Sequence, residues 1–171
     1  MKKYNNQQGV TIVEILLYMS ILSIIIVALS AFLHLSLQSR IKGQIIGDVE
    51  QSSIQSLDII LDNIRAAKTI TLPTRGNNSS SLNLTMPGVS QTVDFRLNAG
   101  KIEMQQNGGG YNAITINKLN ITSLVFSNTT TSVGGLGSAK VTFRSDNINN
   151  SGRNEYNFGK NFQGSASLRI Q

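Results

Sequence analysis

The most restrictive feature of this chain is the apolar run from Val10 to Leu37, which contains a single acid, Glu14. A helix needs about 20 apolar residues to cross a bilayer core, so this run is long enough to span one. It is longer than the apolar region of a secretory signal, which typically has about 7–15 residues. No small-residue cleavage pattern follows it. We therefore predict a retained transmembrane helix over residues 10–37.

Composition limits the chemistry that the rest of the chain can perform. The 171 residues include no Cys and one His, His34, which lies inside the apolar run. These counts exclude a disulfide framework and a thiolate metal site, and they disfavour a His-based metal cluster. Only 14% of the residues are charged, against about 25% in ordinary soluble domains. We expect no catalytic residues, no metal and no cofactor.

The charges beside the apolar run do not orient it. Lys2 and Lys3 precede it, and Arg40 and Lys42 follow it, so the positive-inside rule is tied. The remainder of the chain is rich in Asn, Ser, Thr and Gly, a composition that suits an exposed location. We expect a single-pass protein of the cytoplasmic membrane with its short leader inside and its bulk outside.

Glu14 is unusual because it lies within the apolar run. An ionised carboxylate costs about 2.5–3.5 kcal/mol near the bilayer centre and less near an interface. One interpretation is an acid that reaches the head groups and has no further role. The other is an acid that meets a positive partner inside an assembly, since intramembrane acids usually mark functional pairings.

The N-terminal pattern resembles that of type IV pilins and pseudopilins. A short basic leader ends at Gly9, Val10-Thr11-Ile12-Val13-Glu14 follows, and a long apolar helix begins there. The resemblance implies that prepilin peptidase cuts after Gly9, that the new terminus at Val10 is methylated, and that Glu14 pairs with the terminal amine of a neighbouring subunit. The leader, residues 1–9, carries the charges of Lys2 and Lys3. Val10 stands where the family commonly has Phe.

The resemblance also implies partners and a location. These are other pilin or pseudopilin subunits, prepilin peptidase, an inner-membrane assembly platform and membrane lipid, with a cell-surface or periplasmic filament as the assembled form. A buried pair between Glu14 and the amine of Val10 would fix the axial register of the subunits. Major pilins often carry a C-terminal disulfide, so the absence of Cys favours a minor pilin or minor pseudopilin of a pilus, type II secretion or competence-type filament.

Residues 38–68 continue the helix with an amphipathic pattern. Apolar residues and one serine recur at steps of three and four, which predicts a face packed on a sheet. This stripe consists of Ile46, Val49, Ser53, Leu57, Ile60 and Ile64, widened by Ile45, Ile54 and Leu61. Gly43 and Gly47 each cost about 1 kcal/mol relative to Ala. They indicate either a bend or two tolerated glycines in a straight helix.

Residues 69–171 predict a β-rich head behind one helix, and so an α+β, pilin-like fold with an antiparallel sheet. Thr69–Leu72 leave the helical pattern, and residues 74–81 form a polar loop. Asn98-Ala99-Gly100 predicts a three-residue hairpin loop with glycine in the left-handed conformation. The expected strands are Ser81–Met86, Thr92–Leu97, Lys101–Gln105, Ala113–Asn117, Ile121–Ser127, Ala139–Arg144 and Ser165–Ile170.

Two other functions stay open. The head could act as a binding module at a filament, either an adhesin or a DNA receptor. Its basic residues are scattered rather than clustered, so a solvated surface is the simpler interpretation of its positive charge. Asp146, Asn147, Asn149, Asn150 and Glu155 could suggest a calcium loop, but their spacing is not that of an EF-hand. In the third interpretation, the chain keeps its leader and remains a membrane anchor that never polymerises.

Overall fold

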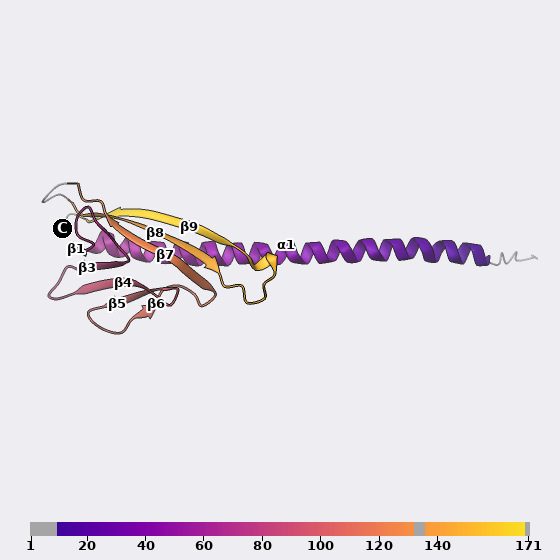
Figure 1. Cartoon of the computed structure of the whole chain (residues 1–171), viewed down its shortest axis with the longest axis horizontal. Coiled ribbons are helices and arrows are strands. Elements are labelled where there is room, and N and C mark those ends of the chain that lie inside the picture. The colour runs from indigo at the N-terminus through magenta and orange to yellow at the C-terminus, as the bar shows by residue number, and fades with distance from the viewer. Residues whose placement is uncertain (1–9, 132–135, 170–171) are drawn as a thin grey trace, which may run out of the picture. The chain divides into compact units, whose positions relative to one another are not determined.

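The computed structural model describes residues 10–131 and 136–169. Within these residues it contains one long α-helix, nine β-strands and a short 3-10 helix (Figure 1). The chain divides after Arg40 into two compact units, residues 1–40 and 41–171, and α1 (Ile12–Ala66) contributes residues to both. The expected leader, with Lys2, Lys3 and Gly9, lies outside the described residues.

The strands form two antiparallel sheets. The five-stranded sheet has the order β1-β3-β4-β5-β6 and the four-stranded sheet has the order β2-β7-β8-β9. The predicted α+β, pilin-like architecture is confirmed, with the strands divided between two sheets where one was expected. The strand bounds are β1 Thr69–Leu72, β2 Asn78–Ser79, β3 Ser81–Thr85, β4 Thr92–Asn98, β5 Lys101–Gln106, β6 Asn112–Ala113, β7 Leu119–Asn128, β8 Ser138–Asn147 and β9 Gly159–Ser167; the 3-10 helix η1 is Asn154–Tyr156.

One hydrophobic core joins the second part of α1 to the inner faces of both sheets. Its helical members begin at Ile45 and continue through Val49, Ile60 and Ile64. The predicted stripe is largely confirmed, but Ile54 is 49% exposed, so its assignment to the packed face was wrong. The packed face includes Ser53, as predicted, and also two serines that were not expected there, Ser52 and Ser56, all three buried.

Close packing of β9 against the helix requires a small residue on the strand. Gly164 of β9 lies against the side chains of Leu57 and Leu61, and a Cβ at this position would come within 2.9 Å of Leu61 Cδ1. The glycine therefore lets the strand approach these two leucines of the helix closely. Gly43 and Gly47 both lie in uninterrupted helix, and a Cβ added at either would meet no neighbouring atom within 4 Å. Both interpretations of these glycines, a bend and two tolerated glycines in a straight helix, stay predictions.

Five expected strands are confirmed with small shifts of their ends, and two are corrected. The expected strand Ala113–Asn117 is wrong because β6 ends at Ala113. The chain then turns inward, where the carbonyl of Ile114 accepts a hydrogen bond from Ser56 Oγ at 3.0 Å and Thr115 is buried. The last strand ends at Ser167, and the Arg169 N–H donates to the Arg65 carbonyl of α1 at 3.2 Å. Ile170 lies outside the described residues.

The predicted hairpin between β4 and β5 has a shorter loop than expected. Asn98 and Lys101 are directly paired, which leaves a two-residue turn. Ala99 has a φ of 47° and Gly100 a φ of 73°. Two successive positive φ values are characteristic of the type I′ turn, which matches the twist of the flanking strands. The polar loop 74–81 also differs from expectation, since it contains β2 and the first residue of β3.

Candidate functional site

The start of α1 is organised by a side-chain cap at Thr11. The Thr11 hydroxyl accepts a hydrogen bond from the Glu14 backbone N–H at 3.3 Å, and its carbonyl accepts from the Ile15 N–H at 3.2 Å. Thr followed three residues later by Glu is the sequence pattern of a capping box. The cap leaves Val10 outside the helix, with 62% of its surface exposed.

The Glu14 side chain does not turn back to complete that capping box. Its Oε1 instead accepts a hydrogen bond from the Tyr18 hydroxyl at 3.0 Å, one helical turn further along. Sequence reasoning missed Tyr18, although the spacing of four residues places the two side chains on one face of the helix. The carboxylate is thus partly satisfied within its own chain and remains exposed.

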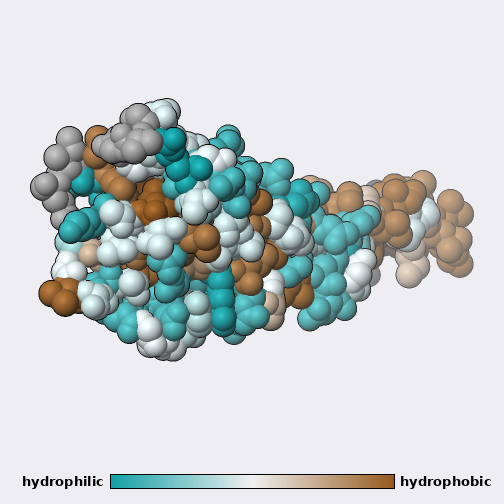
Figure 2. All heavy atoms as spheres, turned by 60° about the vertical axis from the view of Figure 1, so that its left-hand side comes forward, coloured by the Kyte–Doolittle hydropathy of each residue, from teal (hydrophilic) through white to brown (hydrophobic). Residues whose placement is uncertain are grey.

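The surface around Glu14 is apolar. Every residue from Val10 to Leu37 is exposed, and α1 is the one described helix that is long and apolar enough to cross a membrane. Apolar side chains cover the visible surface of this segment in Figure 2. Three of its four serines satisfy their hydroxyls within the helix, because Ser20, Ser23 and Ser30 donate to carbonyls of the preceding turn at 2.8 Å. Such bonds suit a helix that meets lipid or other helices.

The structure describes some of the predicted site residues and not others. Val10 and Glu14 are both described, both exposed and four residues apart. No hydrogen bond joins them within the described part of the chain. Gly9, Lys2 and Lys3 lie outside it. The geometry is therefore that of two separate, accessible groups on one subunit, an N-terminal segment at Val10 and a carboxylate at Glu14.

Comparison with known families bears directly on this segment. A family profile described as "Prokaryotic N-terminal methylation motif" matches residues 4–30. The chain carries the N-terminal signature of type IV pilins and pseudopilins. No curated protein and no solved structure matches the chain. The motif implies a pilin-like precursor that prepilin peptidase processes and that assembles with other pilin subunits, and the apolar helix fits an inner-membrane anchor.

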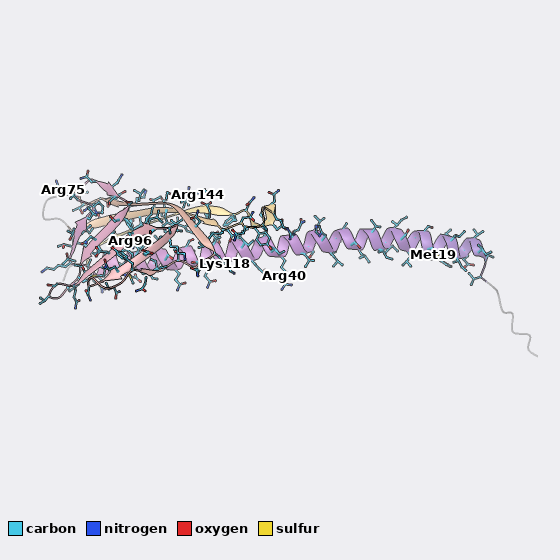
Figure 3. All side chains as sticks on the ribbon, turned by 60° about the horizontal axis from the view of Figure 1, so that its bottom comes forward. Met19, Arg40, Arg75, Arg96, Lys118 and Arg144 are labelled. Carbon is cyan, nitrogen blue, oxygen red and sulfur yellow. The ribbon has the colours of Figure 1, made fainter. Side chains whose placement is uncertain are left out.

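The head presents its positive charge in dispersed, mostly paired form. Arg75, Arg96, Lys118 and Arg144 lie at separate places on its surface (Figure 3). Five of its cations form ion pairs: Arg96 with Glu103, Lys118 with Asp48, Arg144 with Asp146, Arg153 with Glu155, and Lys160 with Glu50. This pairing reduces the positive field that a polyanion would encounter.

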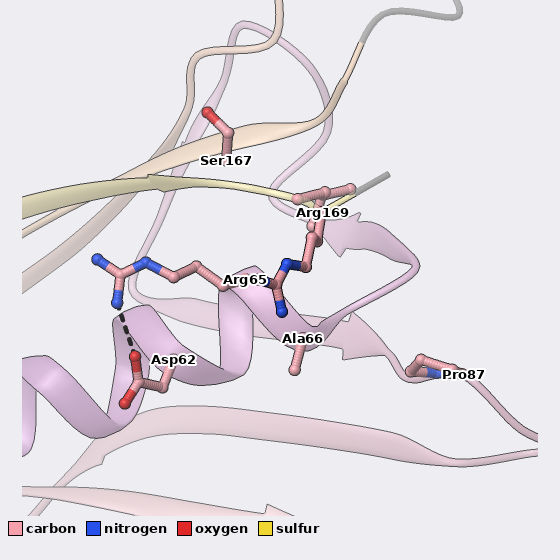
Figure 4. Close-up of a pocket in the computed structure, with 7 residues that line it drawn as sticks. Asp62, Arg65, Ala66, Pro87, Ser167 and Arg169 are labelled. Carbon is pink, nitrogen blue, oxygen red and sulfur yellow. Dashed lines mark hydrogen bonds and ion pairs between the residues drawn. The ribbon is translucent and has the colours of Figure 1, made fainter. Parts of the chain in front are cut away.

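A hollow of about 750 Å³ lies at the C-terminal end of α1. Arg65 turns toward Asp62, which it contacts at 2.6 Å, and the Arg169 side chain is directed toward Ala66 (Figure 4). Pro87 closes another side. The lining has no pairing of a nucleophile with a base. Across residues 10–131 and 136–169, no group of three or more His, Asp or Glu could hold a metal ion.

Proposed function

We propose that this protein is a minor pilin or minor pseudopilin, a structural subunit that enters a filament through the N-terminal part of α1. The observation that carries the proposal is the single carboxylate of Glu14 in an exposed apolar helix, inside the segment that matches the methylation motif. Such a surface has two compatible environments, a bilayer before assembly and a bundle of like helices afterwards. The head contributes the outward surface of the subunit.

Processing would create the partner that Glu14 lacks. Cleavage after Gly9 would leave the amine of Val10 as the terminus, and methylation keeps an amine positively charged. Because the helix begins at Ile12 with its cap at Thr11, the Val10 amine would precede the helix and be accessible to a neighbouring subunit. The roles of Gly9 and Val10 in this step are part of the proposal.

A pair between Glu14 and the Val10 amine of a neighbour would set the axial register of the filament. Burying either charge alone is strongly unfavourable, so subunits that pack with the two groups out of register would be rejected. Before assembly, the Tyr18 hydroxyl already satisfies one carboxylate oxygen of Glu14. This internal bond lowers the cost of holding the acid near the membrane interface.

The minor subtype is proposed from the head. Major pilins often close a C-terminal loop with a disulfide, and this chain has no Cys. The scattered and largely paired cations of the head favour a structural subunit over a DNA receptor. The head would lie outside the cytoplasmic membrane.

Processing is tested by intact-mass analysis of the membrane-extracted protein, expressed with its cognate prepilin peptidase. We expect a chain that begins at Val10 and carries one added methyl group. A chain that keeps Met1 in the presence of active peptidase would refute the pilin assignment and identify the protein as a simple membrane anchor. Expression without the peptidase provides the unprocessed reference mass.

The role of Glu14 is tested by replacing it with an uncharged side chain of the same shape. Glu14→Gln should be processed normally, but its amount in sheared filaments should fall by at least about 100-fold, because an unpaired buried charge costs about 3–5 kcal/mol. Asp58→Asn is the matched control, an acid-to-amide change on the exposed side of α1 beyond the apolar segment. Equal incorporation of both variants would refute the register role of Glu14.

A further inference from the structure

The outer face of the five-stranded sheet carries a shallow polar groove. This groove has no role in the proposed filament assembly through α1. Cross-strand pairing places Leu72, Asn83 and Asp94 in one row across β1, β3 and β4. The same pairing places Ser81 beside Arg96 in the next row. These side chains surround a hollow of about 380 Å³. The groove therefore has an apolar end at Leu72, which is 40% exposed, and a polar floor.

Asp94 is the acid of this floor, and it has no cationic partner among the described residues. One of its oxygens, Oδ1, accepts a hydrogen bond from the Asn83 amide. Partial burial raises the pKa of Asp94 above its ordinary value, and the bond from Asn83 opposes that rise. The second carboxylate oxygen has no hydrogen bond to a described residue. Asp94 thus offers a fixed, partly desolvated acceptor to the groove.

Arg96, two residues away on the same face, is held away from Asp94. Its Nε and Nη2 both lie 2.9 Å from Glu103 Oε2, and the Tyr111 ring covers its guanidinium at 3.4 Å from the ring centroid. Asn98 donates to the other Glu103 oxygen at 3.1 Å. These contacts neutralise the arginine and fix its plane. Its Nη1 has no hydrogen bond to a described residue, and the side chain is 42% exposed, so this nitrogen can act as a donor.

We propose that this groove binds a neutral oligosaccharide. Sugar hydroxyls both donate and accept hydrogen bonds. The groove offers the Asp94 acceptor, the Arg96 Nη1 donor and the Ser81 hydroxyl, which lies 3.3 Å from Ser79 Oγ and keeps capacity for a second hydrogen bond. The C–H face of a sugar ring would rest on Leu72 and the edge of Tyr111. The net charge of Asp94, Arg96 and Glu103 together is −1, which disfavours sialylated, sulfated and nucleic-acid ligands. This proposal does not depend on filament assembly.

The test is titration calorimetry of the full-length chain in a zwitterionic detergent that has no sugar head group. The probes are gluco-, manno- and galacto-trisaccharides at millimolar concentration, with sialylated and sulfated oligosaccharides for comparison. We expect at least one neutral trisaccharide to bind the wild type. Asp94→Asn should then weaken binding about 10- to 100-fold, because a hydrogen bond to a charged group contributes about 1.5–3 kcal/mol.

Two further variants keep the result interpretable. Asp146→Asn is the matched control, because Asp146 is an outward-facing acid of the other sheet that pairs with Arg144 at 2.9 Å. It should leave the affinity unchanged. Leu72→Ser tests the apolar end of the groove without altering any charge and should also weaken binding. The proposal is overturned if no neutral trisaccharide binds, if Asp94→Asn and Leu72→Ser bind as tightly as wild type, or if the charged oligosaccharides bind better.

Discussion

Lys160 Nζ of β9 lies 2.6 Å from Glu50 Oε1 of α1, although the two residues are 110 positions apart in the chain. A second pair of the same kind joins Lys118 to Asp48 of α1 at 3.2 Å. Both pairs connect the four-stranded sheet region to the helix at its margin, outside the hydrophobic core. The side chains of Lys160 and Glu50 are 51% and 38% exposed, so water screens their attraction.

Breaking the pair between Lys160 and Glu50 should therefore have a small effect on stability. In a double-mutant cycle of Glu50→Gln and Lys160→Met, we expect a coupling energy of about 0.2–1 kcal/mol. It should shrink further at 1 M salt, where the screening length is about 3 Å. Urea unfolding followed by tyrosine fluorescence measures it, since the chain has no Trp. A coupling above about 3 kcal/mol that persists in salt would contradict this account.

Two buried serines of α1 differ in one respect that can be measured. Ser56 Oγ lies 2.9 Å from the Ser52 carbonyl and 3.0 Å from the Ile114 carbonyl, whereas Ser53 Oγ is buried without a partner among the described residues. Ser56→Ala should cost about 1 kcal/mol more than Ser53→Ala, which should be neutral or stabilising. The gain in helix propensity is the same in both variants and cancels. Equal unfolding free energies for the two would show that the Ile114 contact contributes nothing.

The sequence predicts those elements whose signals are local. The apolar run, the amphipathic stripe and the β-rich segments each predict the bounds of an element to within a few residues, as for β4 and β5. They do so because burial of one face gives the sequence the hydrophobic period of a helix or a strand. Ile54 fails because it lies at the edge of the stripe, where the packing of the sheets decides burial. Ser52 and Ser56 were not expected in the core because serine carries no apolar signal.

Features that depend on register could not be predicted from the sequence. Asn83 and Asp94 become neighbours only through the pairing of β3 with β4, and Tyr111 reaches Arg96 from another loop. Likewise, β2 pairs with β7 of the four-stranded sheet, although its two residues lie inside what the sequence marks as a polar loop. The contacts at the start of α1 are different, because they join residues three or four positions apart: Thr11 with Glu14 and Glu14 with Tyr18. Such contacts can be predicted from the spacing of the residues in a helix.

The tight turn between β4 and β5 should be sensitive to a side chain at Gly100. Its φ of 73° favours glycine, and an added Cβ would collide with Asn120 Oδ1. Gly100→Ala should lower the free energy of unfolding by about 1–2 kcal/mol, the cost of a left-handed conformation for a residue with a Cβ. Gly110→Ala is the control, since a Cβ there meets nothing within 4 Å. Comparable losses in both variants would show that the turn geometry is not the cause.

Asp94 should make the groove a source of pH-dependent instability. Burial raises its pKa above the ordinary value of 3.8, so ionisation opposes folding at neutral pH. Asp94→Asn should therefore be more stable than wild type at pH 7. As pH falls through the raised pKa of Asp94, the carboxylate is protonated in the folded protein before it is protonated in the unfolded chain, which stabilises the wild type. Below 3.8 both states are protonated, and the difference in unfolding free energy between wild type and Asp94→Asn should disappear.

Glu103, the partner of Arg96 beside the groove, should affect stability in the opposite direction to Asp94. Hydrogen bonds from Asn98 and then Arg96 lower its pKa below 4.5, so its contribution to stability is full above that value and is lost as pH falls through the lowered pKa. Glu103→Gln should thus be less stable than wild type at pH 7, with the difference closing below about pH 4.5. Urea unfolding of both variants from about pH 3 to about pH 7 measures the two trends. If Asp94→Asn were less stable than wild type at pH 7, the Asp94 carboxylate would stabilise the fold. That result would contradict the account of Asp94 as a partly desolvated acceptor.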